Sequence, residues 1–335
     1  MNGIDDFLEA QYKGCGRQLN VERFLDGHLS HAQWQREVAG RVRELLGRMP
    51  HHEQPVQADF HLPEETLEFG TRGKLTIKAE CCLDTPVFIL RPKMEDDKTP
   101  VILCLHGHGF GHADIVGMLG EDSYQKQFAV AVCENGMIAV APELAGFGAL
   151  RLQEDILLKK AEESSCHRLS MGLLSCGRTM AGVRVHQCAR VLDVIQSLFP
   201  GHPIGVMGIS GGGMIAAFLT VLDQRISACV ISGYACTFRD SILAVHHCVD
   251  NYLPGMLEWF EMEDVLAAIA PRPMLWETGS RDPIFPQEAV LRAGAAVRRC
   301  YERLNAAGAF QIHAFQGGHE ISGEESYAFL KARCV

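Results

Sequence analysis

The feature that most constrains the fold of this chain is a series of short apolar runs separated by helical patterns. VILCL (101–105) is wholly apolar, and similar runs recur in MIAVAPEL, PIGVMGIS, SACVISGY, PMLWETGS and, more weakly, FQIHAFQGG. Helical periodicity fills the stretches between them, as in TMAGVRVHQCARVLDVIQSLF. Wholly apolar runs are typical of strands buried on both faces of a sheet. The alternation therefore predicts βαβ units and an α/β fold with a mostly parallel central sheet flanked by helices.

Residues 1–65 have a different pattern, which predicts a helical N-terminal arm. FLEAQYKGCG and HAQWQREVAGRVRELLGRM carry apolar residues at three- and four-residue spacing with charges between them. Strands are expected only from about residue 66, where LEFGTRGKLTIKAECC and TPVFILRP indicate antiparallel neighbours. We therefore expect one large α/β domain over residues 66–335. The arm could be a cap, a packing element or a contact between copies of the chain.

Two stretches, about 150–178 and 236–262, do not fit the alternation of strands and helices. The first is rich in charge, Ser and Cys, and the second carries much aromatic bulk and an expected helix around His246 and His247. Insertions at the carboxyl ends of strands are where lids and substrate pockets are usually built. We expect both stretches to form a lid.

Charge and hydropathy limit the partners of the chain. Among 335 residues, 31 Lys+Arg stand against 41 Asp+Glu, a net charge of −10. This balance disfavours nucleic acid and anionic membrane surfaces, which require clustered cations. The longest apolar run, GGMIAAFLTVL (212–222), is too short to span a bilayer, and MNGIDDFLEA is unlike a signal peptide. We expect a cytoplasmic protein with neither nucleic acid nor membrane as a partner.

Thirteen cysteines are present, an odd number, with no C-x-x-C pair among them. The adjacent Cys81 and Cys82 cannot chelate zinc in the usual finger geometry. Cys104 and Cys229 lie inside apolar runs, where cysteine acts as a small hydrophobic residue. This usage predicts reduced core thiols in a reducing compartment, with neither a disulfide framework nor a resident metal.

The segment PIGVMGISGGGMIAAFLTVL carries the strongest chemical signal. It reads as a strand, a G-x-S-x-G turn centred on Ser210, and a helix, which is the context of a nucleophile elbow. So sharp a turn strains the backbone, and Gly208 and Gly212 remove Cβ atoms that would collide. Ser210 would then project beside a helix N-terminus, which favours developing negative charge. The alternative is a helix start capped by the serine.

A serine nucleophile needs a base, and fifteen histidines are available. Only His246, His247, His313 and His319 follow Ser210 in a suitable region. His313 falls inside an expected strand, and His246 and His247 fall in the second insertion. His319 lies in GGHEI directly after the last strand-like run, with glycines that allow a close approach. We therefore predict His319 as the base.

The base in turn needs an orienting acid. Asp282 stands in GSRDPIFP, after the strand PMLWETG, and suits this position in chain order. Its alternative role is a turn residue before Pro283. Glu277 is the second candidate, and Glu320 would point away if His319 points inward. We predict Asp282 as the acid.

The loop HGHGFG (106–111) follows VILCL and predicts an oxyanion hole. Its glycines would let main-chain N–H groups face a developing oxyanion, together with the N–H of Gly211. We assign the donors to Gly211 and to His108 or Gly109.

The same loop permits two other interpretations. His106, His108 and His112 could form a metal cluster, but no carboxylate with ligand-like spacing accompanies them. Glycines 107, 109 and 111 with Glu143 could indicate a dinucleotide site, but their spacing is not G-x-G-x-x-G. We predict neither a cofactor nor a metal here.

HGHGFG, GISGGG, GSRDPIFP and GGHEI, in this order, resemble the motifs of α/β-hydrolase-fold serine esterases. The helix before GVMGISGGG is similar to the dienelactone hydrolase and acetyl xylan esterase (cephalosporin C deacetylase-like) branches. The resemblance covers about residues 75–330 and implies Ser210 as nucleophile, Asp282 as acid and His319 as base. Dienelactone hydrolases proper carry a cysteine in the elbow, and the β-propeller of prolyl-oligopeptidase relatives has no counterpart here.

These observations lead us to expect a serine hydrolase that cleaves a carboxylic ester of a small molecule through an acyl-enzyme. The resemblance implies short acyl groups, including acetyl on a carbohydrate. An amidase or peptidase with the same triad, and an inactive binding protein of this fold, remain as alternatives. A homo-oligomer could form through the N-terminal arm or the lid.

Overall fold

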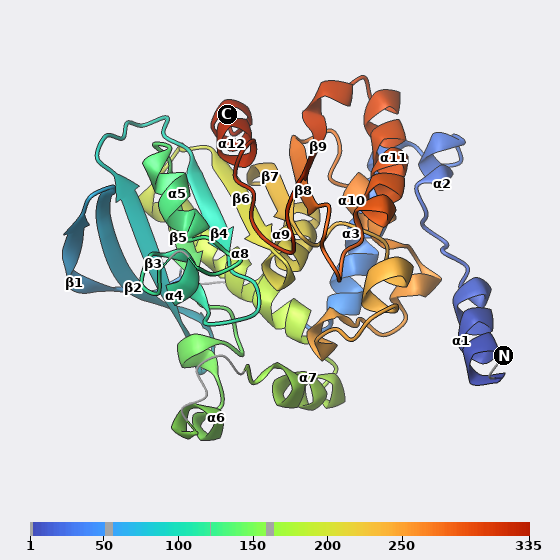
Figure 1. The fold of residues 1–335 in the computed structure, drawn as a ribbon, viewed down its shortest axis with the longest axis horizontal. Helices are drawn as coiled ribbons and strands as arrows, with labels where there is room; N and C mark the ends of the chain where they lie inside the picture. Colours follow the sequence, from blue (N-terminus) through green and yellow to red (C-terminus); the bar gives the residue numbers. More distant parts are fainter. Residues whose placement is uncertain (1–2, 51–55, 121, 159–163) are drawn as a thin grey trace.

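The computed structural model describes residues 3–50, 56–120, 122–158 and 164–335. In these ranges nine strands form one sheet in the order β1-β2-β3-β5-β4-β6-β7-β8-β9 (Figure 1). Neighbours from β5 through β4 to β9 are parallel, while β1, β2 and β3 run antiparallel. The strands are β1 Ala58–Leu67, β2 Gly70–Glu80, β3 Leu83–Pro92, β4 Val101–Leu105, β5 Ile138–Pro142, β6 Ile204–Ile209, β7 Ile226–Ser232, β8 Met274–Gly279 and β9 Phe310–Phe315. The predicted mostly parallel sheet is confirmed.

Helices cover both faces of this sheet. The apolar side chains of β4 show the division, because Val101, Leu103 and Leu105 join one buried cluster while Ile102 and Cys104 join another. The first cluster packs under α3 His31–Leu46, α8 Met180–Leu198, α9 Gly211–Leu222, α10 Met262–Ala267 and α11 Gln287–Arg303. The second packs under α4 His112–Ile115, α5 Phe128–Glu134 and α12 Ser326–Arg333. A strand buried on both sides has no polar face, which is why its sequence does not alternate.

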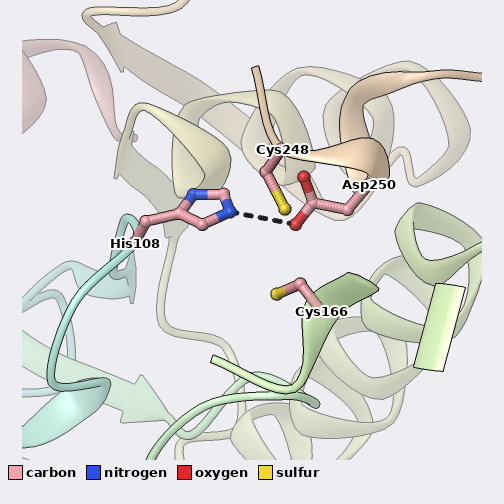
Figure 2. Close-up of side chains that lie close together, drawn as sticks. All are labelled: His108, Cys166, Cys248 and Asp250. Atoms are coloured by element: carbon pink, nitrogen blue, oxygen red, sulfur yellow. Dashed lines mark ion pairs between the residues drawn. The ribbon is translucent and has the colours of Figure 1, made fainter. Parts of the chain in front are cut away.

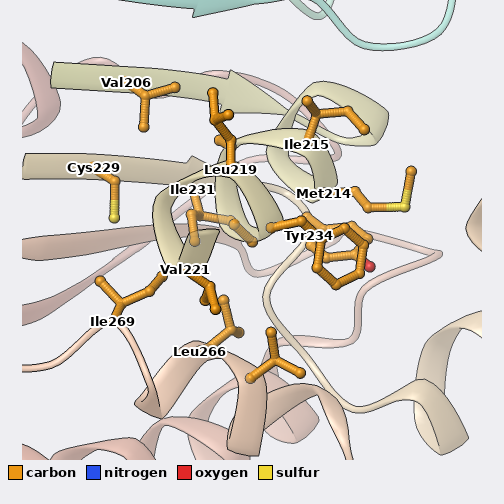
Figure 3. Packing of buried hydrophobic residues seen from close by; sticks show 14 of the residues in the cluster. Val206, Met214, Ile215, Leu219, Val221, Cys229, Ile231, Tyr234, Leu266 and Ile269 are labelled. Carbon is orange, nitrogen blue, oxygen red and sulfur yellow. The ribbon is translucent and has the colours of Figure 1, made fainter. Parts of the chain in front are cut away.

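The larger cluster centres on α9. Figure 3 shows Met214, Ile215 and Leu219 of this helix among the side chains of β6 and β7, with Leu266 of α10 on the other side. All four are at most 1% exposed. Such complete burial fixes α9, and with it the turn that leads into the helix, on the sheet.

The N-terminal segment is helical, as predicted, with α1 Gly3–Gly14, α2 Glu22–Leu25 and α3. However, α3 is a core helix: Trp34, Val38, Val42 and Leu46 are buried, and the helix contacts α8 and α9. The indole Nε1 of Trp34 donates a hydrogen bond to the carbonyl of Leu19 at 2.9 Å. Of these three N-terminal helices, α1 is the one without a buried residue.

The first strand begins earlier than expected. β1 starts at Ala58 and pairs with β2, so the expectation of no strand before about residue 66 was wrong. The physical reason is that β1 is an edge strand whose side chains are almost all exposed. Without a buried face it has no apolar periodicity that sequence analysis could detect.

The described residues of the first predicted insertion include α6 Gln153–Leu157 and α7 Cys166–Ser175, and η1 Gly148–Leu150 leads into it. Residues 159–163 of this insertion lie outside the described residues. The second contains η2 Phe238–Ile242, η3 Val249–Asn251 and η4 Met256–Glu258. The fifth short helical turn, η5 Ala307–Ala309, precedes β9.

The helix expected around His246 and His247 is absent, since these residues lie in irregular backbone between η2 and η3. Contacts to other segments account for the difference. Ser241 Oγ donates to the carbonyl of Ile284 at 2.6 Å, and Tyr252 Oη donates to the carbonyl of Ile242 at 2.9 Å. Such contacts hold the segment in a shape that local propensity does not favour.

In the part of the chain that the structure describes, no helix combines the length and the apolar character needed to cross a bilayer.

Candidate active site

Ser210 stands on the turn between β6 and α9 with φ 54° and ψ −122°. Non-glycine residues adopt a positive φ only where surrounding structure imposes it. A Cβ on Gly208 would lie 2.3 Å from the carbonyl oxygen of Gly212, and a Cβ on Gly212 would lie 2.0 Å from that of Leu105. The need for glycine at both positions is therefore confirmed. The amide N–H of Ser210 donates to the carbonyl of Ser232 at 2.9 Å, which ties the turn to β7.

Asp282 follows β8 and His319 follows β9, and the structure brings the two together. Nδ1 of His319 lies 2.8 Å from Oδ2 of Asp282. The other oxygen, Oδ1, accepts the backbone N–H groups of Ile284 and Phe285, each at 3.0 Å. Asp282 thus fills both roles considered for it, as a turn residue through one oxygen and as the partner of His319 through the other.

Aromatic rings fix the plane of His319. Tyr124 stacks against it at 5.5 Å between centroids, and Phe285 stacks at 5.7 Å. A Cβ on Gly233 would come within 3.0 Å of the His319 ring. The imidazole therefore has little freedom to rotate.

Ser210 and His319 line one cavity of about 290 Å³. His108 and Tyr124 form part of its wall, and residues 246–248 of the second insertion form another part. A cavity of about 470 Å³ lies between α1 and the second insertion, but neither Ser210 nor His319 lines it. The cavity with the reactive groups is thus enclosed partly by a segment that we predicted to be a lid.

The loop after β4 is held next to the elbow by a polar network. Leu105 of β4 pairs with Gly208 of β6, so the two turns are neighbours. The N–H of Gly107 donates to Oε1 of Gln125 at 2.7 Å, and Tyr124 Oη donates to the carbonyl of His108 at 2.7 Å. The first N–H groups of a helix have no partner within the helix. Those of α9 begin at Gly211, where an added Cβ would lie 3.0 Å from the ring of His108 in this loop.

Comparisons with known proteins agree with this arrangement. The sequence pattern of the Abhydrolase family matches residues 26–320, which include α3 and most of the predicted arm. The chain belongs to the Abhydrolase family.

Individual proteins resemble this chain in sequence or in fold. This chain is 26% identical over 262 residues to "Putative hydrolase YtaP" of Bacillus subtilis (strain 168). The match covers 73% of this chain and 82% of that protein. A "putative acetyl xylan esterase" from Bacteroides fragilis NCTC 9343 superposes with a TM-score of 0.77 at 18% identity, over 98% of this chain and 89% of that one. A glucuronoyl esterase from Solibacter usitatus gives a TM-score of 0.66 at 14% identity over 94% of each chain. The predicted α/β-hydrolase fold is confirmed.

The other residues considered as acid or base have different partners in the structure. Glu277 is buried and accepts from Ser232 Oγ at 2.7 Å, from the N–H of Gly323 at 2.8 Å and from Ser326 Oγ. His313 pairs with Ser322 and with two glutamates of the following loop. Glu320 pairs with Lys126 at 2.8 Å and points away from Asp282, as expected.

The three histidines of the 106–112 segment do not form one cluster. Nε2 of His106 and Nε2 of His112 lie 3.2 Å and 3.5 Å from the carboxylate of Glu143, whereas His108 faces Asp250. The sequence had shown no carboxylate near these histidines, because Glu143 follows the next strand in the chain. Burial alone would raise the pKa of Glu143, but His106 and His112 outweigh it and lower that pKa.

Sequence analysis missed a polar cluster beside the cavity. Nε2 of His108 lies 3.2 Å from Oδ2 of Asp250, and the thiols of Cys166 and Cys248 lie nearby (Figure 2). Arg184 of α8, only 1% exposed, donates to Asp250 at 2.6 Å and to Cys166 Sγ at 2.9 Å. No spacing in the sequence relates residues from four separate segments. The sequence offered one signal for this cluster: Arg184 is a charged residue among apolar residues at the start of a long predicted helix.

Proposed function

We propose that this protein is a serine hydrolase that cleaves carboxylic esters through an acyl-enzyme. One observation carries the proposal: Ser210, in a strained elbow, opens into the same cavity as His319, whose Nδ1 is held by Asp282. Nucleophile, base and orienting acid are the three groups that this chemistry requires.

In the proposed reaction, Nε2 of His319 accepts the proton of Ser210 Oγ as that oxygen attacks the ester carbonyl. The tetrahedral oxyanion accepts hydrogen bonds from the N–H groups of Gly211 and of His108 or Gly109. The C–O bond to the alcohol breaks, and the alcohol leaves with the proton held by His319. Water then attacks the acyl-enzyme with His319 as base, releasing the acid and restoring Ser210.

Asp282 stabilises the imidazolium and holds its tautomer. Its Oδ2 accepts the proton on Nδ1 of His319, which leaves Nε2 as the basic nitrogen. Stacking by Tyr124 and Phe285 keeps the ring in that orientation. The base is therefore positioned before substrate arrives.

The substrate that we propose is a short-chain ester, including acetyl groups on a carbohydrate. The cavity of about 290 Å³ suits a small acyl group, and its wall offers polar atoms of Tyr124, His247 and Asn251 to a hydroxyl-rich alcohol. The names of the structural neighbours, an acetyl xylan esterase and glucuronoyl esterases, support the same substrate class.

Hydrolysis of p-nitrophenyl acetate by purified wild type and Ser210→Ala tests the proposal. We expect the substitution to lower kcat by about 10⁴-fold or more, because the nucleophile is lost. Ser280→Ala, which removes an exposed hydroxyl bonded to Gln316, is the matched control and should keep wild-type activity. Equal activity in the wild type and Ser210→Ala would refute the assignment.

Three further measurements define the acyl preference and separate the alternatives. An acyl series from acetyl to octanoyl should show kcat/KM falling with chain length. A matched anilide cleaved faster than the ester would indicate an amidase, and a folded protein unreactive toward a fluorophosphonate probe would indicate a binding protein.

A cytoplasmic location is part of the same proposal. All thirteen cysteines are free thiols, and Cys81, Cys82 and Cys176 among them are exposed. Exposed thiols persist in a reducing compartment. Thiol counting on protein extracted under rapid alkylation would test it, with thirteen reactive thiols expected after denaturation.

A further inference from the structure

Four side chains without a role in the proposed reaction converge beside the cavity (Figure 2). They are His108, Cys166, Cys248 and Asp250, and one nitrogen, sulfur or oxygen atom of each lies within 4.8 Å of all the others. His108 comes from the loop after β4, Cys166 begins α7, and Cys248 and Asp250 flank the start of η3. The cluster thus joins both predicted insertions to the loop beside the elbow.

We propose that these four residues form a zinc site. An imidazole nitrogen, two sulfurs and a carboxylate oxygen are donors that Zn²⁺ takes in tetrahedral geometry. Bond lengths of about 2.0–2.3 Å would place the ligand atoms roughly 3.3–3.8 Å apart. Ligand atoms now within 4.8 Å of one another would therefore need to approach by at most about 1.5 Å.

The backbone permits that contraction. His108 lies between Gly107 and Gly109, and Cys248 lies in irregular backbone before η3. Nε2 of His108 is buried and has no hydrogen-bond partner in this arrangement, although Oδ2 of Asp250 lies 3.2 Å away. The contact with Asp250 is thus an ion pair without a well-formed hydrogen bond, and in the metal-bound state both groups would be ligands of the same ion.

The charges of the cluster match a divalent cation. Two thiolates and the Asp250 carboxylate carry three negative charges, and the guanidinium of Arg184 offsets one of them. The remaining charge of −2 is neutralised by Zn²⁺. Arg184 donates to two of the proposed ligand residues, Asp250 and Cys166, and its positive charge is part of this balance.

Outer contacts orient the ligands, as they do in established metal sites. Arg184 donates to Cys166 Sγ at 2.9 Å and to Oδ2 of Asp250 at 2.6 Å. Nδ2 of Asn251 donates to Oδ1 of Asp250 at 2.9 Å. The ring of Phe147 lies under Arg184 at 4.7 Å and meets His108 edge-on at 5.1 Å.

Cobalt substitution tests the site without any activity measurement. The full chain, fully reduced, stripped with a chelator and kept anaerobic, is titrated with Co²⁺. We expect one Co²⁺ per chain, thiolate-to-cobalt charge-transfer absorption, the visible bands of tetrahedral cobalt, and displacement of all of these by Zn²⁺.

Cysteine variants assign the ligands. Cys166→Ser and Cys248→Ser should each lower the charge-transfer absorption by about half, and each should weaken zinc binding at least tenfold. Cys176→Ser is the matched control, because Cys176 is an exposed thiol just beyond the same helix α7 and is outside the cluster. It should leave both quantities unchanged.

The wild-type spectrum decides the proposal even if a variant fails to fold. Folded, reduced wild type that gives no charge-transfer absorption at micromolar Co²⁺ overturns it, as does absorption unchanged in both Cys166→Ser and Cys248→Ser. Ester hydrolysis enters none of these measurements, so their outcome is separate from that of the proposed function.

Discussion

At the scale of single residues, Asp282 shows how one carboxylate serves two structural needs. Oδ1 closes the turn to Ile284 and Phe285, and Oδ2 holds His319. An asparagine has only one oxygen for these two positions. If that oxygen keeps the turn, the amide NH₂ faces Nδ1 of His319 and favours the tautomer with its proton on Nε2, which cannot act as a base.

Asp282→Asn should therefore lower kcat for p-nitrophenyl acetate by about 10³–10⁴-fold while leaving the fold intact. Glu277→Gln is the contrasting variant, since Glu277 holds Ser232, Ser326 and Gly323 rather than His319. It should lower Tm with little change in kcat. The reverse pattern, an inactive Glu277→Gln and an active Asp282→Asn, would make Glu277 the acid.

The elbow glycine gives a second prediction. Gly212→Ala places a Cβ about 2.0 Å from the backbone oxygen of Leu105, which cannot move without breaking β4. We expect a loss of several kcal/mol in the free energy of unfolding, or no soluble protein. Gly172→Ala is the control within helix α7, where no atom lies within 4 Å of the new Cβ. It should raise the stability by about 0.5–1 kcal/mol in chemical denaturation.

Prediction from sequence worked at this scale where a residue's role depends on local backbone. Ser210 and its glycines form a strand–turn–helix motif within a few residues, so their geometry followed from spacing alone. The contact of Asp282 with His319 followed from their positions after neighbouring strands. By contrast, two other contacts could not be predicted: that of Glu143 with His106 and that of Cys166 with Cys248. Each depends on how distant segments pack against each other, which local sequence patterns do not determine.

At the scale of elements, α3 and β1 show why the N-terminal region was harder to predict than the rest. α3 has the amphipathic pattern of any surface helix, yet its apolar face is completely buried against α8 and α9. The pattern indicated a buried face without identifying what buries it. β1 lacks even that signal, because all its side chains between the two partly buried end residues are exposed.

Trp34→Ala tests whether α3 belongs to the core. The side chain is 0% exposed and its Nε1 donates to Leu19, so we expect a loss of about 3–5 kcal/mol in the free energy of unfolding. Glu37→Ala, on the exposed face of the same helix, should change it by less than about 0.5 kcal/mol. Urea denaturation followed by tryptophan fluorescence or circular dichroism measures both. Similar stabilities of the two variants would mean that α3 packs loosely.

At the scale of the whole molecule, the partly buried Glu263 and the buried Asp264 link stability to pH. Burial, followed by the charges of Asp264 and Glu261, raises the pKa of Glu263 to about 8. Burial also raises the pKa of Asp264 to about 7. The folded state holds these protons more tightly than the unfolded chain does. The free energy of unfolding should therefore fall as the pH rises from about 4.5 to about 8.

Glu263→Gln should flatten this decline and make the protein more stable than wild type at pH 8, by an amount on the order of 1 kcal/mol. Glu302→Gln, an exposed glutamate on α11, is the control and should follow the wild-type curve. Urea unfolding at pH 5, 6.5 and 8 measures the effect. A wild-type stability that rises over this range would show that Glu263 is ionised in the folded protein.

The strand order has a consequence for how the protein is made. From β4 through β6, β7 and β8 to β9, the order across the sheet follows the order along the chain. Translation therefore supplies each of these strands after the neighbour on which it docks. A nascent chain completed through the loop after β8 carries both Ser210 and Asp282, but His319 is added only after β9 has been synthesised. Ser210 therefore has no predicted base until the edge strand β9 and the loop after it have been made.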